Sequence, residues 1–435
     1  MLRYTSFRCI FNIMAEVIPF KGLLYNPKKV DVSATTAPPY DIVTPALKEK
    51  LYESSPYNII RIDFGKDADD DNDEENRYTR ASRHLADWQK EGILINDDKA
   101  LFYCYEIEYK VNNITKKTRG FLGAVRIEEP GSGKIHPHEE TYSKPKSDRL
   151  NILRYCNANI SPIFSLFSST EKNVSSILDN TVKGRPFIES TDVDGFIHRL
   201  WRIDSTDDIE AIKEEMADRD IFIADGHHRY ETALAFKKEM EQKGLNNTGN
   251  EQYDYVLMFL ANTEDEGLSL LPTHRIVEID SNIHAKPALA KYFDIQKITS
   301  EGMSGPIAMN RMFEIMRGNS HTFGMYLTNV DVYYALVYNG SDLDVDLPPC
   351  LRKLDVSVLH KFIFGKLLDV EHFEYEMDPG IAVERAKKGS FEAVFFLNPT
   401  DISEVRDVAL AGHRMPPKST YFYPKLLTGM VIYKF

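Results

Sequence analysis

The chain has 435 residues, of which 43% are hydrophobic and 27% are charged, and its formal net charge is −13. This length predicts two or three domains of a soluble globular protein with ample cores. The acidic excess disfavours a nucleic acid or an anionic membrane as a partner, and no apolar run reaches the roughly 18 residues that a membrane-spanning helix needs.

The cysteines and the first residues predict the cellular compartment. Cys9, Cys104, Cys156 and Cys350 are widely spaced and form no C-x-x-C pair, a pattern typical of reduced thiols in a cytoplasmic protein. Residues 1–13 contain a broken apolar patch with no small-residue cleavage site after it. We therefore interpret them as an N-terminal extension rather than a targeting peptide.

Residues 14–128 are predicted to form an N-terminal α+β region. Residues 58–64 alternate apolar and polar side chains as a strand does, and residues 77–91 have the apolar spacing of a helix. The acidic run 67–75 predicts a solvated mobile loop, with metal binding as the alternative. Further strands are expected at 101–109 and 120–127.

Two loops in this part of the chain are less specific. Ala-Pro-Pro-Tyr-Asp at 37–41 predicts a rigid extended segment, because proline fixes φ and disfavours a helical residue before it. It is either a tight connection or a pocket wall. The glycine-rich stretch 128–134 does not fit a P-loop, because Glu128 occupies the place of the first glycine and Ile135 that of Ser/Thr.

Residues 129–278 are predicted to form a central region that opens with a charged stretch. The sequence 135–142 reads Ile-His-Pro-His-Glu-Glu-Thr-Tyr, and basic residues able to neutralise phosphate oxygens follow it. The alternative is a charged connection that caps a helix starting near Ser147. The basic residues are Lys144, Lys146 and Arg149.

The most informative stretch is 221–235, where an apolar strand passes through an Asp-Gly turn into a helix. A helix start attracts anions, because its first N–H groups lack partners inside the helix and its dipole is positive there. Arg229 adds a planar donor fork suited to phosphate, and Gly226 allows close backbone approach. The alternative is an ordinary helix start that Asp225 caps.

Residues 279–435 are predicted to form a C-terminal α+β region, and its main candidate is the proline-rich loop 412–424. Between Pro417 and Pro424 stand an amine and two adjacent hydroxyls, from Lys418, Ser419 and Thr420, which could coordinate phosphate or a small carboxylate. The alternative is a rigid loop whose aromatic residues pack. Just before this region, His274 and Arg275 either face a ligand or form a surface pair.

Asp-Gly-His-His-Arg at 225–229 resembles the motif with which free serine kinases of the ParB/sulfiredoxin-like superfamily hold nucleotide phosphates. From about Met14 to the C-terminus, the chain also resembles a large bacterial and archaeal family of unknown function. That resemblance rests on Pro39-Tyr40-Asp41, His136–Tyr142 and Met415–Pro424. Together they imply an α+β, mixed-sheet, multi-region protein in which 129–278 is a ParB/sulfiredoxin-like nucleotide-binding core. The C-terminal region 279–435 is expected to contribute its Pro-Lys-Ser-Thr loop to the site.

The resemblance also assigns roles to residues. The Pro-His-Glu sequence matches the kinase segment that supplies the catalytic carboxylate, so Glu139 is the expected general base. Asp225 is expected to hold a metal or the attacking hydroxyl, and His228 is expected to stabilise phosphoryl charge. The expected nucleotide-binding residues are Gly226, His227, His228, Arg229, Lys418, Ser419 and Thr420. Glu139 and Asp225 stand further apart than in compact kinases, which predicts an insertion near 170–204.

The leading hypothesis is a cytoplasmic phosphotransferase that moves phosphate from ATP or ADP, with Mg²⁺, to a small hydroxyl-bearing metabolite such as free L-serine. One alternative is a nucleotide-binding or nucleotide-hydrolysing switch without an acceptor, with no nucleic-acid partner, since no basic recognition helix is evident. The other is a metal-dependent hydrolase, although H-E-x-x-H spacing is absent. Its candidate ligands are His136, His138, His227 and His228. The sequence identifies neither metal ligands nor an oligomeric state.

Overall fold

The structure is a computed structural model, and it divides into two compact units whose segments interleave along the chain. Unit 1 comprises Met1–His136, Tyr142–Gly267 and Pro424–Phe435, and unit 2 comprises Pro137–Thr141 and Leu268–Tyr423. The expected N-terminal extension, 1–13, lies outside the described residues. These are 14–111, 114–139, 141, 143–245, 248, 250–265, 267–279, 285–298, 305–343, 345–389 and 391–435, without the side chains of 143–145.

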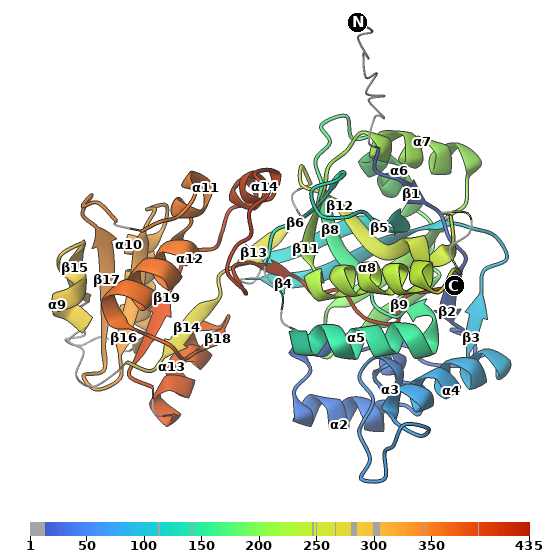
Figure 1. The fold of residues 1–435 in the computed structure, drawn as a ribbon, viewed down its shortest axis with the longest axis horizontal. Helices are drawn as coiled ribbons and strands as arrows, with labels where there is room; N and C mark the ends of the chain where they lie inside the picture. The colour runs from blue at the N-terminus through green and yellow to red at the C-terminus, as the bar shows by residue number, and fades with distance from the viewer. Residues whose placement is uncertain are drawn as a thin grey trace, which may run out of the picture. The chain divides into compact units, whose positions relative to one another are not determined.

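Unit 1 is built on a nine-stranded mixed sheet within the described residues (Figure 1). Its order is β6-β11-β8-β12-β5-β4-β10-β9, with β1 paired to β5. The pair β8 and β12 is parallel, whereas β11 with β8 and β12 with β5 are antiparallel. The strands are β1 (Val17–Ile18), β4 (Phe102–Val111), β5 (Ile114–Arg126), β6 (Ile135–Pro137), β8 (Ile163–Phe167), β9 (Ile188–Thr191), β10 (Ile197–Ile203), β11 (Ile221–Asp225) and β12 (Tyr255–Asn262).

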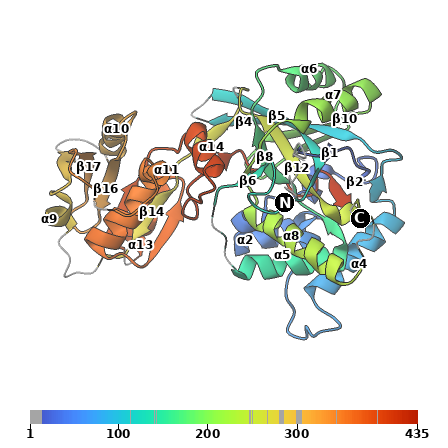
Figure 2. The ribbon, with the colours of Figure 1, turned by 45° about the horizontal axis from the view of Figure 1, so that its top comes forward.

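Helices pack on this sheet and on one another. Helices α5 (Ser143–Cys156) and α8 (His227–Gln242) run side by side in Figures 1 and 2. Helices α6 (Asn173–Thr181) and α7 (Thr206–Ala217) contribute Val174, Leu178, Ile212 and Met216 to the core that also contains Phe121 and Ile223. The other helices are α1 (Val32–Thr35), η1 (Tyr40–Ile42), α2 (Pro45–Ser54), α3 (Ile60–Asp63), α4 (Arg77–Lys90) and η2 (Gln252–Asp254).

A second sheet of unit 1 joins segments that are far apart in the chain. Its order is β3 (Leu94–Asn96), β2 (Gly22–Tyr25), β21 (Ile432–Lys434) and β7 (Ala158–Asn159). The last strand therefore pairs with strands from both predicted regions, 14–128 and 129–278. These two regions also share the nine-stranded sheet, so the boundary predicted near residue 128 falls inside unit 1.

The strand predicted at 58–64 is wrong, because the structure has helix α3 there. The Asn58 side chain accepts from the Ile60 amide at 2.9 Å and donates to the Thr36 carbonyl at 3.0 Å, which fixes a turn at the start of the segment. Ile59, Ile60 and Ile62 are all fully buried. Two consecutive isoleucines are therefore buried, whereas a half-exposed strand buries every second side chain.

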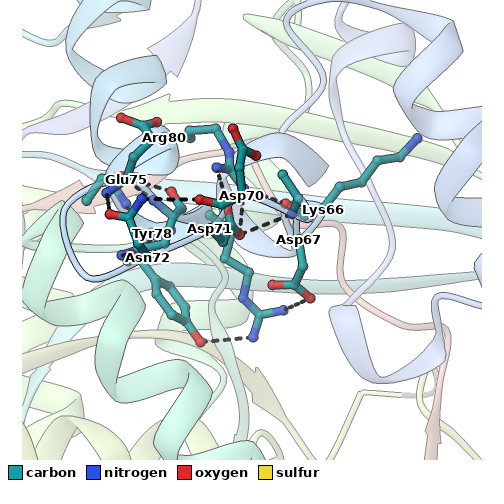
Figure 3. A network of polar contacts seen from close by, with 12 residues as sticks. Lys66, Asp67, Asp70, Asp71, Asn72, Glu75, Tyr78 and Arg80 are labelled. Atoms are coloured by element: carbon teal, nitrogen blue, oxygen red, sulfur yellow. Dashed lines mark hydrogen bonds and ion pairs between the residues drawn. The ribbon is translucent and has the colours of Figure 1, made fainter.

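The acidic run 67–75 forms a loop held by its own contacts (Figure 3). Arg80 at the start of α4 donates to the Asp71 carboxylate at 3.0 Å and to the Lys66 carbonyl at 2.9 Å. The Asn72 side chain accepts from the amides of Glu74 and Glu75 at 2.9 and 3.0 Å. The predicted loop is present, and its side chains organise it.

Unit 2 centres on an antiparallel six-stranded sheet within the described residues, in the order β15-β17-β16-β19-β14-β18. Beside it, β13 (Ser269–Leu271) pairs with β20 (Tyr421–Tyr423). The sheet strands are β14 (His274–Val277), β15 (Phe293–Ile298), β16 (Thr322–Leu327), β17 (Val332–Tyr338), β18 (Phe373–Glu376) and β19 (Ala393–Phe396).

Strand alternation in unit 2 builds a core on each face of this sheet. On β16, Phe323 and Met325 join one core, and Tyr326 joins the other. The first core packs α14 (Ile402–Leu410) and the π-helix η3 (Val358–Leu368), and the second packs α10 (Gly305–Met316) and α13 (Pro379–Lys388). The remaining helices are α9 (Ala285–Leu289), α11 (Pro349–Arg352) and α12 (Asp355–Ser357).

The predicted fold class is confirmed: the chain is an α+β protein with a mixed sheet and more than one compact unit. In the part of the chain that the structure describes, we find no helix with the length and apolar character to cross a membrane.

Candidate functional site

The predicted site residues fall into two groups, one in each unit. Asp225 to Arg229 belong to unit 1, at the junction of β11 and α8, and the other group belongs to unit 2. The unit 2 residues are Glu139, Lys418, Ser419 and Thr420.

In unit 1, α8 starts directly behind a glycine whose backbone few other residues adopt. Gly226 has φ +96°, and a Cβ placed on it would lie 2.9 Å from the Arg229 Nε atom. Two features therefore favour glycine at this position: the positive φ, and the close contact of the Arg229 guanidinium with the backbone. Glycine carries no capping side chain, and the positive end of the dipole of this 16-residue helix lies at its first turn.

Two cations hold the Asp225 carboxylate in this unit. The Arg229 guanidinium donates to Oδ2 at 2.9 Å, and the Lys425 amine donates to Oδ1 at 2.7 Å. Arg229 also donates to the Pro162 carbonyl. All three charged side chains are at most 20% exposed. Lys425 was missed by the sequence reasoning, because a single lysine after a proline carries no signal that it will meet a residue so distant in the chain.

Unit 1 also contains a buried ion pair between Asp63 and Arg149. Arg149 donates to the Asp63 carboxylate at 2.7 Å, and its guanidinium covers the Tyr40 ring at 4.0 Å. Burial raises the pKa of Asp63 above its ordinary value, against the opposing effect of Arg149. Burial also raises the pKa of Tyr40, to about 12. Tyr40 of the Pro-Pro-Tyr-Asp loop thus packs against the Arg149 guanidinium.

A small cavity is lined by Asp63, Arg149 and Arg229, among other residues. Its volume is about 40 Å³, which holds a few water molecules and is too small for a nucleotide. Among the described residues, one oxygen of the buried Asp63 carboxylate has no hydrogen-bond partner. The lining residues are Asp63, Arg149, Ile152, Leu153, Ala158, Asn159, Ile160, Ser161, Arg229, Thr232 and Val256.

The basic residues predicted to neutralise phosphate are engaged elsewhere. Lys146 pairs with Glu231 of α8 at 2.9 Å, and Arg149 is buried with Asp63. The Lys144 side chain lies outside the described residues. Lys146 and Arg149 therefore tie helix α5 to its neighbours in this structure.

In unit 2, the Glu139 carboxylate is held by the proline-rich loop. Glu139 forms a parallel bridge with Met415, and the Lys418 backbone N–H donates to its Oε1 atom. The Arg414 guanidinium donates to the Glu139 carbonyl at 2.8 Å. Glu139 and Lys418 are 279 positions apart in the chain, so no local sequence pattern indicates this contact.

The side chains of Lys418, Ser419 and Thr420 in that loop differ in exposure. Lys418 is exposed, whereas Ser419 and Thr420 are each 7% exposed. The Ser419 hydroxyl donates to the Pro416 carbonyl, and the Thr420 hydroxyl lies 3.3 Å from Nε2 of the buried His138. The Ser419 hydroxyl thus bonds within the loop, and the Thr420 hydroxyl contacts the segment that carries Glu139.

The four histidines of the hydrolase alternative have different surroundings. The His136 ring bonds to Asp220 at 2.8 Å and stacks on Phe222. His138 is fully buried, His227 is 5% exposed in the first turn of α8, and His228 in the same turn is half-buried. Within the described residues, no group of three or more His, Cys, Asp or Glu side chains is arranged to hold a metal ion.

The fold and these features define an α+β protein with a glycine-led helix start in one unit and a loop-held carboxylate in the other. The chain belongs to the family described as "Protein of unknown function (DUF1015)", whose model matches residues 17–357. This match confirms the family resemblance seen in the sequence. No curated protein matches.

Solved structures similar to this chain include three with low identity. A free serine kinase in complex with AMP is 14% identical over 68% of this chain and 89% of that one, with a TM-score of 0.33. A conserved hypothetical protein from Pyrococcus furiosus is 13% identical over 68% and 92%, with a TM-score of 0.33. C-terminally truncated SbnI from Staphylococcus aureus is 11% identical over 71% and 87%, also at 0.33. At these values the likenesses say nothing about the chemistry of this chain.

Proposed function

We propose that this protein is a nucleotide-dependent small-molecule kinase that phosphorylates an alcohol such as free L-serine. The observation that carries the proposal is the start of α8, where Gly226 leads a long helix and Arg229 is fixed in its first turn. A helix N-terminus with a guanidinium beside it suits the oxygens of a polyphosphate. His227 and His228 occupy the same turn and would add donors.

The proposed chemistry needs one base. The acceptor hydroxyl oxygen attacks the terminal phosphorus of ATP or ADP, its proton passes to the Glu139 carboxylate, and the shortened nucleotide leaves. The Lys418 N–H donates to the Oε1 atom of this carboxylate and so orients it for the role of base. In unit 1, Arg229 and the start of α8 would bind the phosphates of the nucleotide.

Asp225 does not fit the expected role of a metal ligand. Both of its carboxylate oxygens accept hydrogen bonds from cations, Arg229 and Lys425. A further cation there would have to displace one of them. In the proposal, Mg²⁺ therefore arrives bound to the nucleotide phosphates, and Asp225 holds the two basic side chains in place.

Phosphorus NMR of the protein with Mg²⁺, L-serine and either ATP or ADP tests the proposal. We expect a phosphoserine signal that falls at least about a hundredfold in Glu139→Gln, because a general base contributes that much. We expect a comparable loss in Arg229→Ala, together with weaker nucleotide binding. Glu129→Gln and Arg154→Ala are matched controls, since both side chains belong to exposed surface ion pairs of unit 1.

A switch without an acceptor is the second candidate, favoured by the internal hydrogen bonds of Ser419 and Thr420, which reduce the groups left to hold an acceptor. The same samples separate the two functions. The switch is supported, and the kinase overturned, by two results together. The unaltered protein forms no phosphomonoester, and Glu139→Gln still binds nucleotide. Absence of nucleotide binding overturns both.

A further inference from the structure

Arg275 of β14 is the largest fully buried side chain of the described residues, and it serves the loop that holds Glu139. Its Nε donates to Nε2 of His360 at 2.9 Å, and one Nη donates to the Thr273 carbonyl. The other Nη donates to the Lys418 carbonyl at 3.0 Å. Arg275 therefore spans from the sheet of unit 2 to the proline-rich loop.

His360 is built to accept this hydrogen bond. Burial, reinforced by the neighbouring Arg275, holds the pKa of His360 well below its ordinary value, so the ring is neutral and Nε2 carries a lone pair. Its ring packs against Phe364 and Phe373 with centroids 5.8 and 5.0 Å apart. It is presented by the π-helix η3, a rare element that is frequent at functional sites.

The residue that Arg275 reaches has an unusual backbone. Lys418 has φ +58°, in the left-handed region where a residue with a Cβ is disfavoured and needs outside support. Its carbonyl is fixed by Arg275, and its N–H is the donor to the Glu139 carboxylate. The carbonyl and the N–H of Lys418 thus link the buried Arg275 guanidinium to Glu139, the proposed base.

We infer that Arg275, oriented by His360, is a positioning residue that keeps Lys418 in its left-handed conformation so that the Lys418 N–H holds Glu139. The inference rests on the proposed function for the role of Glu139 as a base. The geometric part, from His360 through Arg275 to Lys418, stands on unit 2 alone.

Amide hydrogen exchange tests the geometric part without activity. In the unaltered protein, the Lys418 amide must be protected even though its side chain is exposed. Exchange at the rate of an unstructured peptide would overturn the inference. In Arg275→Met, which keeps much of the buried volume and removes the donors, we expect exchange at Lys418 to speed up by more than about tenfold, and more than elsewhere in unit 2.

Kinetics test the catalytic part. We expect Arg275→Met to lower kcat by about ten- to a hundredfold with little change in the KM for nucleotide, because the base is misplaced while phosphate binding in unit 1 is intact. The acidic limb of the pH–rate profile should move to higher pH, since a carboxylate that loses a donor is easier to protonate. A merely structural loss of active protein would leave the shape of that profile unchanged and would overturn the positioning role.

Controls keep the result decisive. Arg385→Met removes a guanidinium of unit 2 that is 40% exposed and pairs with Glu374 and Glu376, so it should change neither exchange at Lys418 nor the profile. Should Arg275→Met not fold, His360→Leu removes only the acceptor that orients the guanidinium. Unchanged exchange at Lys418 in the folded variant overturns the inference. If the unaltered protein transfers no phosphate, the proposed function fails while the exchange data still decide the geometry.

Discussion

At the residue scale, Gly226 is the position where the local backbone and the candidate phosphate site depend on each other. We expect Gly226→Ala to lower the free energy of unfolding by at least twice as much as Gly195→Ala. Gly195 also has a positive φ, +79°, but a Cβ there meets no atom within 4 Å, so it measures the backbone cost alone, about 1 kcal/mol. A Cβ at 226 would in addition push the Arg229 guanidinium from its place.

Urea unfolding followed by tryptophan fluorescence measures both variants in the same unit, since Trp88, Trp201 and the two glycines all belong to unit 1. Equal losses for the two variants would mean that the contact with Arg229 does not constrain residue 226. Nucleotide affinity should fall only in Gly226→Ala, because only this substitution disturbs the guanidinium.

At the element scale, the acidic loop 67–75 depends on the first turns of α4 (Figure 3). The hydrogen bond from Arg80 lowers the pKa of Asp71, as expected for a charge-assisted contact. We expect Arg80→Ala to free the loop and to accelerate its cleavage before aspartate residues about fivefold or more, measured with a protease of that specificity. Arg83→Ala is the control, because Arg83 pairs with Glu75 on the exposed surface. Equal cleavage rates would show that Asp71 does not hold the loop.

The elements also show what a sequence can predict. The strand at 221–225 and the helix behind it are confirmed, because their spacing and the Asp-Gly turn are local signals. The helix predicted at 77–91 is confirmed as α4, which starts at the capping box of Asn76. The strand predicted at 58–64 was wrong because the burial of its isoleucines depends on the packing around them, which local alternation does not show.

At the scale of the whole molecule, prediction ends where contacts are distant in the chain. The pairing of β21 with β2 and β7 depends on the return of Pro424–Phe435 to unit 1, which no local pattern encodes. The contacts of Asp225 with Lys425 and of Glu139 with Lys418 have the same origin. His274 and Arg275 are both 1% exposed, so the alternative of a surface pair is wrong. Their burial depends on contacts with distant parts of the chain, which the local sequence does not show.

The two units should respond differently to acid. Burial lowers the pKa of His274 in unit 2 from its ordinary value near 6.5 to about 3. Below about pH 6.5 the unfolded state therefore binds a proton that the folded state does not, and stability falls as the pH decreases toward 3. From pH 7.5 to pH 5 this loss is about 2 kcal/mol for a single histidine. His360, whose pKa is also lowered, acts in the same direction and in the same unit.

Both tryptophans of the chain, Trp88 and Trp201, belong to unit 1, so their fluorescence follows that unit, while far-ultraviolet circular dichroism follows both. We expect thermal unfolding at pH 5 to show a dichroism transition below the fluorescence transition. His274→Asn keeps an acceptor near the Leu397 amide but does not titrate, and it should reduce the acid shift of the dichroism transition alone. His372→Asn, at an exposed position of unit 2, should leave it unchanged. The dichroism and fluorescence transitions could instead coincide, and His274→Asn could shift both together. That result would mean that the two units unfold as one cooperative body and that the buried histidine destabilises the whole chain at acid pH.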